Sequence, residues 1–132
     1  MKLPVKRVTC AVIMEGGKVF AARRGKQAKH PFKWEFPGGK VEAGESDEAC
    51  LHRELNEELG MQVEIMQKLP VFEHAYPDFH IRLVPFVCRP TGSGHTPGEH
   101  DLTEWFAPEY LPGLDWAEAD VPVMQFVLKH FF

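Results

Sequence analysis

The sequence has few cysteines, no long run of apolar residues and no excess of positive charge. Its three cysteines, Cys10, Cys50 and Cys88, are far apart and odd in number, which is typical of reduced core residues and not of a disulfide framework or a zinc site. The run from Val8 to Met14 is too short to span a membrane, and no signal-peptide cleavage pattern follows it. The net charge of −4 argues against a nucleic-acid polymer as a partner. We expect a cytoplasmic protein that binds neither a membrane nor a nucleic-acid polymer.

The length and composition indicate one globular domain. With 132 residues, 44% of them hydrophobic and 26% charged, the chain can bury roughly two thirds of its unfolded surface in a single core. It contains no internal repeat and no low-complexity linker. We therefore expect a single domain over residues 1–132, present as a monomer or a homodimer.

Hydrophobic patterns and turn residues predict a fold of the α/β (α+β) class. The β-rich run from Val8 to Met14 indicates a buried strand, and Glu15-Gly16-Gly17 indicates a hairpin turn after it. The basic segment 23–33 indicates a loop. Pro85 interrupts a later strand, which favours an edge strand or a β-bulge there. The other predicted strands cover residues 18–22, 34–36, 62–65, 71–76, 81–88 and 103–106.

Two helices are predicted, over residues 47–59 and 121–131. Ser46 is a favourable N-cap for the first helix, and Gly60 is a natural stop after it. A stripe of leucines at helical spacing predicts the buried face of this helix. These leucines are Leu51, Leu55 and Leu59.

Three carboxylates, those of Glu54, Glu57 and Glu58, are expected to lie together on one face of the first helix. Like charges at this spacing destabilise a helix by roughly 0.2–0.5 kcal/mol per pair, unless a cation lies between them. Clustered glutamates without cysteine or histidine ligands favour Mg²⁺, with Mn²⁺ as a substitute, over Zn²⁺. The alternative is a solvated helix face on which Arg53 pairs with Glu57.

The residues around this helix have a fixed spacing. They are Gly39, Glu45, Arg53, Glu54, Leu55, Glu57, Glu58, Gly60 and Met61. Together they fill every specified place of the pattern GX5EX7REUXEEXGU, in which U is a bulky apolar residue. This pattern is the Nudix box, and a chance match somewhere in the chain is on the order of one in 10⁸. The sequence therefore resembles the Nudix hydrolase family.

The segments that flank the box narrow this resemblance. They are Arg23-Arg24, Trp34 to Lys40, Pro77-Asp78, Glu99 and Ala119 to Pro122. They resemble MutT-type nucleoside triphosphate pyrophosphohydrolases, and the resemblance covers nearly the whole chain. It implies the Nudix fold, a mixed β-sheet sandwiched between helices, in which the box forms a loop–helix–loop.

The resemblance also implies a divalent-metal site. It assigns to the metal the side chains of Glu54, Glu57 and Glu58, the carbonyl of Gly38 and, from a loop outside the box, Glu99. For Glu99, an exposed loop carboxylate is the alternative. A metal at such a site neutralises the charge of a polyphosphate, orients the attack of water and acidifies that water.

Further roles follow from the same resemblance. Glu45 matches a loop carboxylate that Arg53 orients, in a supporting role next to the metal ligands. Glu54 is our candidate for the general base. Arg24 and Lys40 match positions near the triphosphate, although Lys40 also fits an ordinary surface lysine.

Asp120 stands where the MutT-type pattern has an asparagine that reads the base. An ionised aspartate only accepts hydrogen bonds, so it would prefer a donating edge, such as the cytosine amino group or a protonated N7 of an oxidised guanine. A helix N-cap is the alternative role. Phe36 and Phe79 are candidates for stacking on the base, with a core or surface position as the alternative for either residue. Three histidines without ligand spacing are interpreted as structural or surface residues, namely His74, His80 and His100.

The implied function is Mg²⁺-dependent hydrolysis of (deoxy)nucleoside triphosphates, of an oxidised or noncanonical kind (8-oxo-dGTP-like) or of the cytidine type. The products would be a nucleoside monophosphate and pyrophosphate, as in sanitation of the nucleotide pool and DNA repair. One alternative is another nucleoside diphosphate derivative, such as a nucleotide sugar or a dinucleoside polyphosphate. A second is a non-catalytic nucleotide-binding Nudix module, against which the complete set of box glutamates argues.

Overall fold

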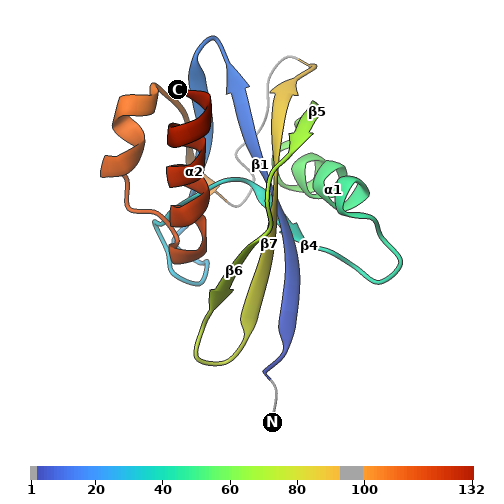
Figure 1. The fold of residues 1–132 in the computed structure, drawn as a ribbon. Helices are drawn as coiled ribbons and strands as arrows, with labels where there is room; N and C mark the ends of the chain where they lie inside the picture. The colour runs from blue at the N-terminus through green and yellow to red at the C-terminus, as the bar shows by residue number, and fades with distance from the viewer. Residues whose placement is uncertain (1–2, 93–99) are drawn as a thin grey trace.

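The computed structural model describes residues 3–92 and 100–132, which form a mixed β-sheet with helices on both sides (Figure 1). The helices α1 (Asp47–Leu59) and α2 (Val121–Phe131) lie on opposite sides of the long strands β1 (Val5–Glu15) and β7 (His80–Pro90). The predicted sandwich is confirmed. The other elements are β2 (Lys18–Arg24), β3 (Trp34–Glu35), β4 (Gly38–Lys40), β5 (Val63–Lys68), β6 (Phe72–Ala75), β8 (His100–Phe106) and the 3-10 helices η1 (Pro108–Gly113) and η2 (Glu118–Asp120).

Strand β1 joins two groups of strands. It pairs in parallel with β7 along most of its length and in an antiparallel manner with the short β4. It pairs with β2 only beside their turn, at Met14 with Val19 and at Glu15 with Lys18. Strand β2 in turn pairs with β3 and β8. The strands β1 and β2 therefore meet at one end and part beyond it.

The turn between β1 and β2 has the conformation that its glycines permit. Gly16 and Gly17 have φ values of 59° and 76°, in the left-handed region that residues with a Cβ rarely adopt. Two such residues in succession form the turn that matches the twist of a β-hairpin. The hairpin predicted from Glu15-Gly16-Gly17 is confirmed.

Helix α1 begins and ends at the predicted residues. The Ser46 hydroxyl accepts a hydrogen bond from the Ala49 amide at 3.1 Å, which satisfies a free donor of the first turn. Gly60 has a φ of 59°, and its amide donates to the Asn56 carbonyl at 3.0 Å, so the helix ends in a glycine cap. The predicted stripe of leucines is fully buried.

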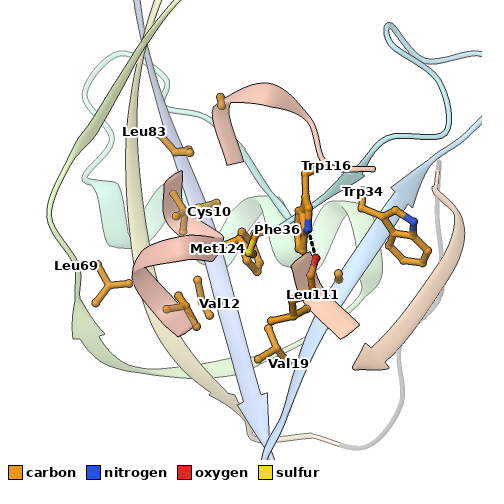
Figure 2. Packing of buried hydrophobic residues seen from close by; sticks show 14 of the residues in the cluster. Cys10, Val12, Val19, Trp34, Phe36, Leu69, Leu83, Leu111, Trp116 and Met124 are labelled. Atoms are coloured by element: carbon orange, nitrogen blue, oxygen red, sulfur yellow. Dashed lines mark hydrogen bonds between the residues drawn. The ribbon is translucent and has the colours of Figure 1, made fainter. Parts of the chain in front are cut away.

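Alternate residues of β1 serve two hydrophobic clusters. Ala11 and Ile13 pack in the cluster that includes the leucines of α1. Cys10 and Val12 belong to the other cluster, which Figure 2 shows with Met124 of α2. Because successive residues of a strand point to opposite faces, one strand supports both helices. Each cysteine is buried and free, as predicted for core residues.

The expectation of an edge strand at Pro85 is wrong. Strand β7 is internal: β1 lies on one side of it, and β5 and β6 share the other side. The carbonyl of Pro85 accepts from Leu69, which lies between β5 and β6. The amide and carbonyl of a strand residue point the same way, so the hydrogen that proline lacks would face this gap between two strands. A ladder bond is therefore not lost.

Most strands extend beyond the predicted segments, whereas β3 and β6 are shorter than predicted. The pattern had predicted the second long strand over residues 81–88, and β7 covers His80–Pro90. Its added residues pair with β1, β5 and β6, so tertiary pairing sets the ends. No helix in the described part of the chain is long and apolar enough to cross a membrane.

Candidate active site

Arg53 of α1 donates hydrogen bonds to three carboxylates, and a fourth, that of Glu42, lies 3.7 Å from its guanidinium group. Its Nε and Nη2 donate to Glu45 at 2.7 and 3.0 Å, and its Nη1 donates to Glu54 at 2.9 Å and Glu57 at 3.1 Å. The hydrogen bonds from Arg53 lower the pKa of Glu45 to about 2, and those contacts raise the pKa of Arg53 above its ordinary value. The structure thus brings Glu45 and Arg53 together as the sequence led us to expect.

Two glycines let α1 approach the sheet closely. Gly38 and Gly39 lie on β4, opposite Cys10 and Thr9 of β1. A Cβ atom on Gly38 would overlap the backbone carbonyl of Thr9. A Cβ atom on Gly39 would overlap the carboxylate of Glu54. Glu54 therefore lies directly against this loop because the loop has no side chain there.

The donor groups at this end of α1 fit a hard divalent cation. The carboxylates of Glu54, Glu57 and Glu58 and nearby backbone carbonyls are all oxygen ligands, which Mg²⁺ and Mn²⁺ prefer. In the part of the chain that the structure describes, no three acidic, histidine or cysteine side chains converge closely enough to hold an ion. Two of the three carboxylates, those of Glu54 and Glu57, accept hydrogen bonds from Arg53. Glu99 lies outside the described residues, so the metal assignments stay predictions.

A cavity of about 570 Å³ opens where β1 and β2 part. This volume is in the range of small-molecule sites, roughly 300–1,000 Å³. Its walls come from both groups of strands, from the loop after β2 and from α1. They include Lys6, Arg24, Glu35, Glu58, Tyr76, Phe79 and His100. The acidic end of α1 therefore shares one cavity with an aromatic hairpin.

The aromatic side of the cavity contains Tyr76 and Phe79, which flank the turn between β6 and β7. Their ring centroids are 5.1 Å apart, and the Nζ of Lys6 lies 4.0 Å from the centroid of Phe79. Phe79 lines the cavity, and its role in stacking on a base stays a prediction. The ring of Phe36 is buried in the core, 4.7 Å from Trp116 (Figure 2), but Phe36 also lines a smaller neighbouring cavity together with Asp120, so its role in stacking stays a prediction as well.

Asp120 does not cap α2, so that alternative is wrong. Its backbone is already helical, with φ −87° and ψ −17°, and its side chain makes no capping hydrogen bond. It accepts instead from the amide of Phe36 at 3.2 Å. Burial, together with the charge of Glu35, raises the pKa of Asp120 to about 8. Near neutral pH the side chain is thus a carboxylic acid that both donates and accepts, as asparagine does.

Asp120 lines a second, smaller cavity of about 80 Å³ beside the first. The two cavities share Arg24, Glu35, Tyr76 and Ile81. The smaller one has room for the edge of a planar ring and not for a whole nucleoside. Asp120 therefore lies at the inner end of the site, in a small cavity that shares walls with the larger cavity lined by Glu58 of the acidic helix.

The buried acid makes stability depend on pH. The pKa of Asp120 is 3.8 in its ordinary state and about 8 in the folded protein, so between these values the folded chain keeps a proton that the unfolded chain has lost. The free energy of unfolding should fall as pH rises through this window, by at most about 1.4 kcal/mol per pH unit. Asp120→Asn removes this contribution, so thermal melts near pH 5 and pH 8 should differ less than in the wild type. An equal difference in both proteins would contradict the buried acid.

Arg24, Glu35 and His100 meet at the wall of the cavity, from β2, β3 and β8. Arg24 Nε donates to Glu35 Oε1 at 2.5 Å, and Arg24 Nη1 donates to the Lys29 carbonyl at 3.3 Å. His100 Nε2 is 3.8 Å from Glu35 Oε2, a charge contact longer than a hydrogen bond. Burial opposes ionisation of Glu35, but His100 and Arg24 outweigh it and hold the pKa of Glu35 below its ordinary value.

The family model of the NUDIX domain matches residues 3–126, and these include both the acidic helix and the walls of the cavity. The chain belongs to the Nudix family. The fold and the hydrolase class predicted from the box are thereby confirmed.

Several relatives with names are similar over most of this Nudix chain. The CTP pyrophosphohydrolase of Escherichia coli (strain K12) is 33% identical over 130 residues, 89% of this chain and 87% of that protein. The 8-oxo-dGTP diphosphatase of the same strain is 34% identical over 115 residues, 83% of this chain and 85% of that protein. A solved structure of MutT from methicillin-resistant Staphylococcus aureus 252 has a TM-score of 0.78 and 34% identity, and each chain covers 98% of the other.

The structure places the remaining predicted residues of this Nudix domain in different surroundings. Arg24 lines the cavity, whereas Lys40 is exposed and contributes its carbonyl to Arg53 at 3.1 Å. His74 forms an ion pair with Glu118 at 3.3 Å outside the cavity, as predicted for a structural or surface histidine. His100 is different, because its side chain is only 8% exposed and lines the cavity.

Sequence reasoning missed most of the residues that line the cavity, and four of these bear on its chemistry. Three of them, Lys6, Tyr76 and His100, have no local pattern that sets them apart, because strand pairing alone brings them to one place. Glu35 did carry a signal: it lies inside the Trp34 to Lys40 segment that resembles MutT-type enzymes.

Proposed function

We propose that this Nudix protein is a Mg²⁺-dependent pyrophosphohydrolase of (deoxy)nucleoside triphosphates, with cytidine-type or oxidised guanine nucleotides as its substrates. One observation carries the proposal: the cavity that Glu58 of α1 lines shares four wall residues with the smaller cavity that contains the buried Asp120. A polyphosphate would lie on the α1 side and a base on the Asp120 side. The names of the two Escherichia coli relatives support the same substrate classes.

The acidic end supplies the hydrolytic half of the site. Glu54, Glu57 and Glu58, with the Gly38 carbonyl and Glu99, would hold the metal. A bound divalent cation supplies charge neutralisation and an acidified water. Arg53 donates a hydrogen bond to Glu54 at 2.9 Å, which holds this carboxylate in one orientation, as a general base requires. The expected products are a nucleoside monophosphate and pyrophosphate.

The cationic side chains of the cavity suit the anionic part of the substrate. Arg24 lines the cavity, and its Nε is anchored by Glu35, so the guanidinium group is fixed in one orientation. A fixed guanidinium binds phosphate oxygens with little loss of side-chain freedom. Lys40, close to the box loop, is the second candidate for a phosphate contact.

The inner end presents a donor and an acceptor to the base. Asp120 is protonated near neutral pH and can donate, and the ionised Glu35 can only accept. An edge with both an acceptor and an amino donor, as in cytosine, complements this pair. Phe79 and Tyr76 offer rings beside it for stacking.

The test is the release of pyrophosphate from dCTP, 8-oxo-dGTP and unmodified dGTP, with Mg²⁺ and with EDTA. We expect release from at least one of the first two nucleotides and none with EDTA. Hydrolysis of ADP-ribose alone would point to nucleoside diphosphate derivatives instead. Binding without hydrolysis of any nucleotide would indicate a non-catalytic module.

A further inference from the structure

The histidine at the start of β8 is poorly explained by the stability of the fold. The His100 side chain is 8% exposed, and its Nδ1 is buried without a hydrogen-bond partner in the described part of the chain. A buried polar nitrogen without a partner costs free energy, whereas an apolar side chain of similar size would fill the space without that cost. We therefore expect the other ring nitrogen, Nε2, to make the contact for which the imidazole is needed.

That other nitrogen faces Glu35. His100 Nε2 lies 3.8 Å from Glu35 Oε2, while Arg24 holds Oε1 of the same carboxylate. The three strands that carry these residues are neighbours: β2 pairs with β8 at Arg24 and His100, and with β3 at Ala22 and Glu35. Glu35 is thus held from two sides, one oxygen by each neighbour.

Glu35 in turn lies at the junction of the two cavities. It lines both of them, and the amide of the next residue, Phe36, binds Asp120 at 3.2 Å. A shift of the Glu35 carboxylate therefore changes the surface that meets the base. We expect it to leave the backbone of α1 in place, because Glu35 is on β3, whereas α1 lies mainly against β4 and β1.

We propose that His100 is a positioning residue for base selection, which holds the Glu35 carboxylate at the inner end of the nucleotide cavity. The inference rests on the proposed function for its substrate class. It adds a residue outside the Nudix box whose effect falls on the choice of base and not on hydrolysis. His100 acts through Glu35 and need not touch the substrate.

The test uses His100→Leu, which removes both nitrogens and fills a similar space. We expect the ratio of kcat/KM for dCTP to that for 8-oxo-dGTP to change by about 5-fold or more, mainly through KM, because a group that pairs with the base has moved. His100→Gln keeps a donor and should restore part of the wild-type ratio. His52→Leu, on the exposed face of α1, is the matched control and should leave the ratio unchanged.

A double-mutant cycle with Glu35→Gln shows whether His100 acts through Glu35. If it does, His100→Leu has little further effect in the Glu35→Gln background, so the two changes are not additive. Full additivity would overturn the proposal. So would an unchanged ratio in folded His100→Leu protein or, should that variant fail to fold, an unchanged ratio in Glu35→Gln alone.

A second readout separates this inference from the proposed function. The affinities for dCMP and 8-oxo-dGMP are measured by calorimetry in EDTA, where no hydrolysis takes place. A wild-type protein that discriminates between these ligands but hydrolyses no triphosphate would refute the proposed function alone. Equal discrimination by wild type and His100→Leu would refute the role of His100 alone.

Discussion

Glu57→Gln should reduce turnover of the preferred nucleotide by at least about 10²-fold while the protein stays folded. The change keeps the shape of the side chain and removes the charge that would hold the metal, which supplies several kcal/mol of transition-state stabilisation. The side chain of Glu57 is 59% exposed, so the loss of its contact with Arg53 should cost little stability. Initial rates over a range of Mg²⁺ concentrations measure the effect.

Glu48→Gln is the matched control for this variant. It makes the same chemical change on the same helix, at an exposed residue of the first turn, away from Arg53. We expect near wild-type turnover and a slightly lower melting temperature, because a negative charge near the start of a helix is favourable. Wild-type turnover in Glu57→Gln at saturating Mg²⁺ would remove Glu57 from the set of metal ligands.

Alanine at the two neighbouring glycines of β4 should have opposite effects. In Gly38→Ala the new Cβ overlaps backbone atoms of Thr9 and Cys10, which cannot move without disturbing β1. We expect the free energy of unfolding to fall by roughly 1–3 kcal/mol. In Gly39→Ala the new Cβ overlaps only the flexible end of Glu54. There we expect nearly normal stability but about 10²-fold slower turnover, because a displaced catalytic group costs that much.

Denaturant unfolding and steady-state kinetics distinguish the two variants. Gly113→Ala serves as the control, since a Cβ there meets no other atom. Normal turnover in a stable Gly39→Ala protein would show that the place of Glu54 against the loop is not needed for hydrolysis. Normal stability in Gly38→Ala would show that β4 can move away from β1 at no cost.

Local signals were enough to predict the acidic helix. The hydroxyl of Ser46, the leucine stripe and Gly60 act within one or two helical turns, so α1 has the bounds that the sequence predicts. The hairpin at Gly16-Gly17 follows from local backbone freedom in the same way. The Nudix family and the cluster of box glutamates were predicted from the spacing of residues within this one segment.

The inner end of the site depends on contacts between distant residues, and there prediction failed. Asp120 was expected to be ionised or to cap a helix, but burial and the nearby Glu35 keep it neutral. The ring of Phe36 lies in the core beside Trp116 and at the wall of the cavity that Asp120 lines, a placement that no local pattern indicates. His100 reaches Glu35 only because β8 returns to pair with β2. The hydrophobic periodicity of the sequence predicts none of these contacts.

Because β1 and β2 pair only beside their turn in the described residues, the width of the cavity can change through residues that do not line it. A hollow whose walls are joined only at one turn has a width that depends on the angle between the two groups of strands. Residues that set this angle, at Gly16-Gly17 or on the buried face of α2, do not line either cavity. Changes at such remote places can therefore widen or narrow the room for a purine or a pyrimidine and leave the acidic helix untouched.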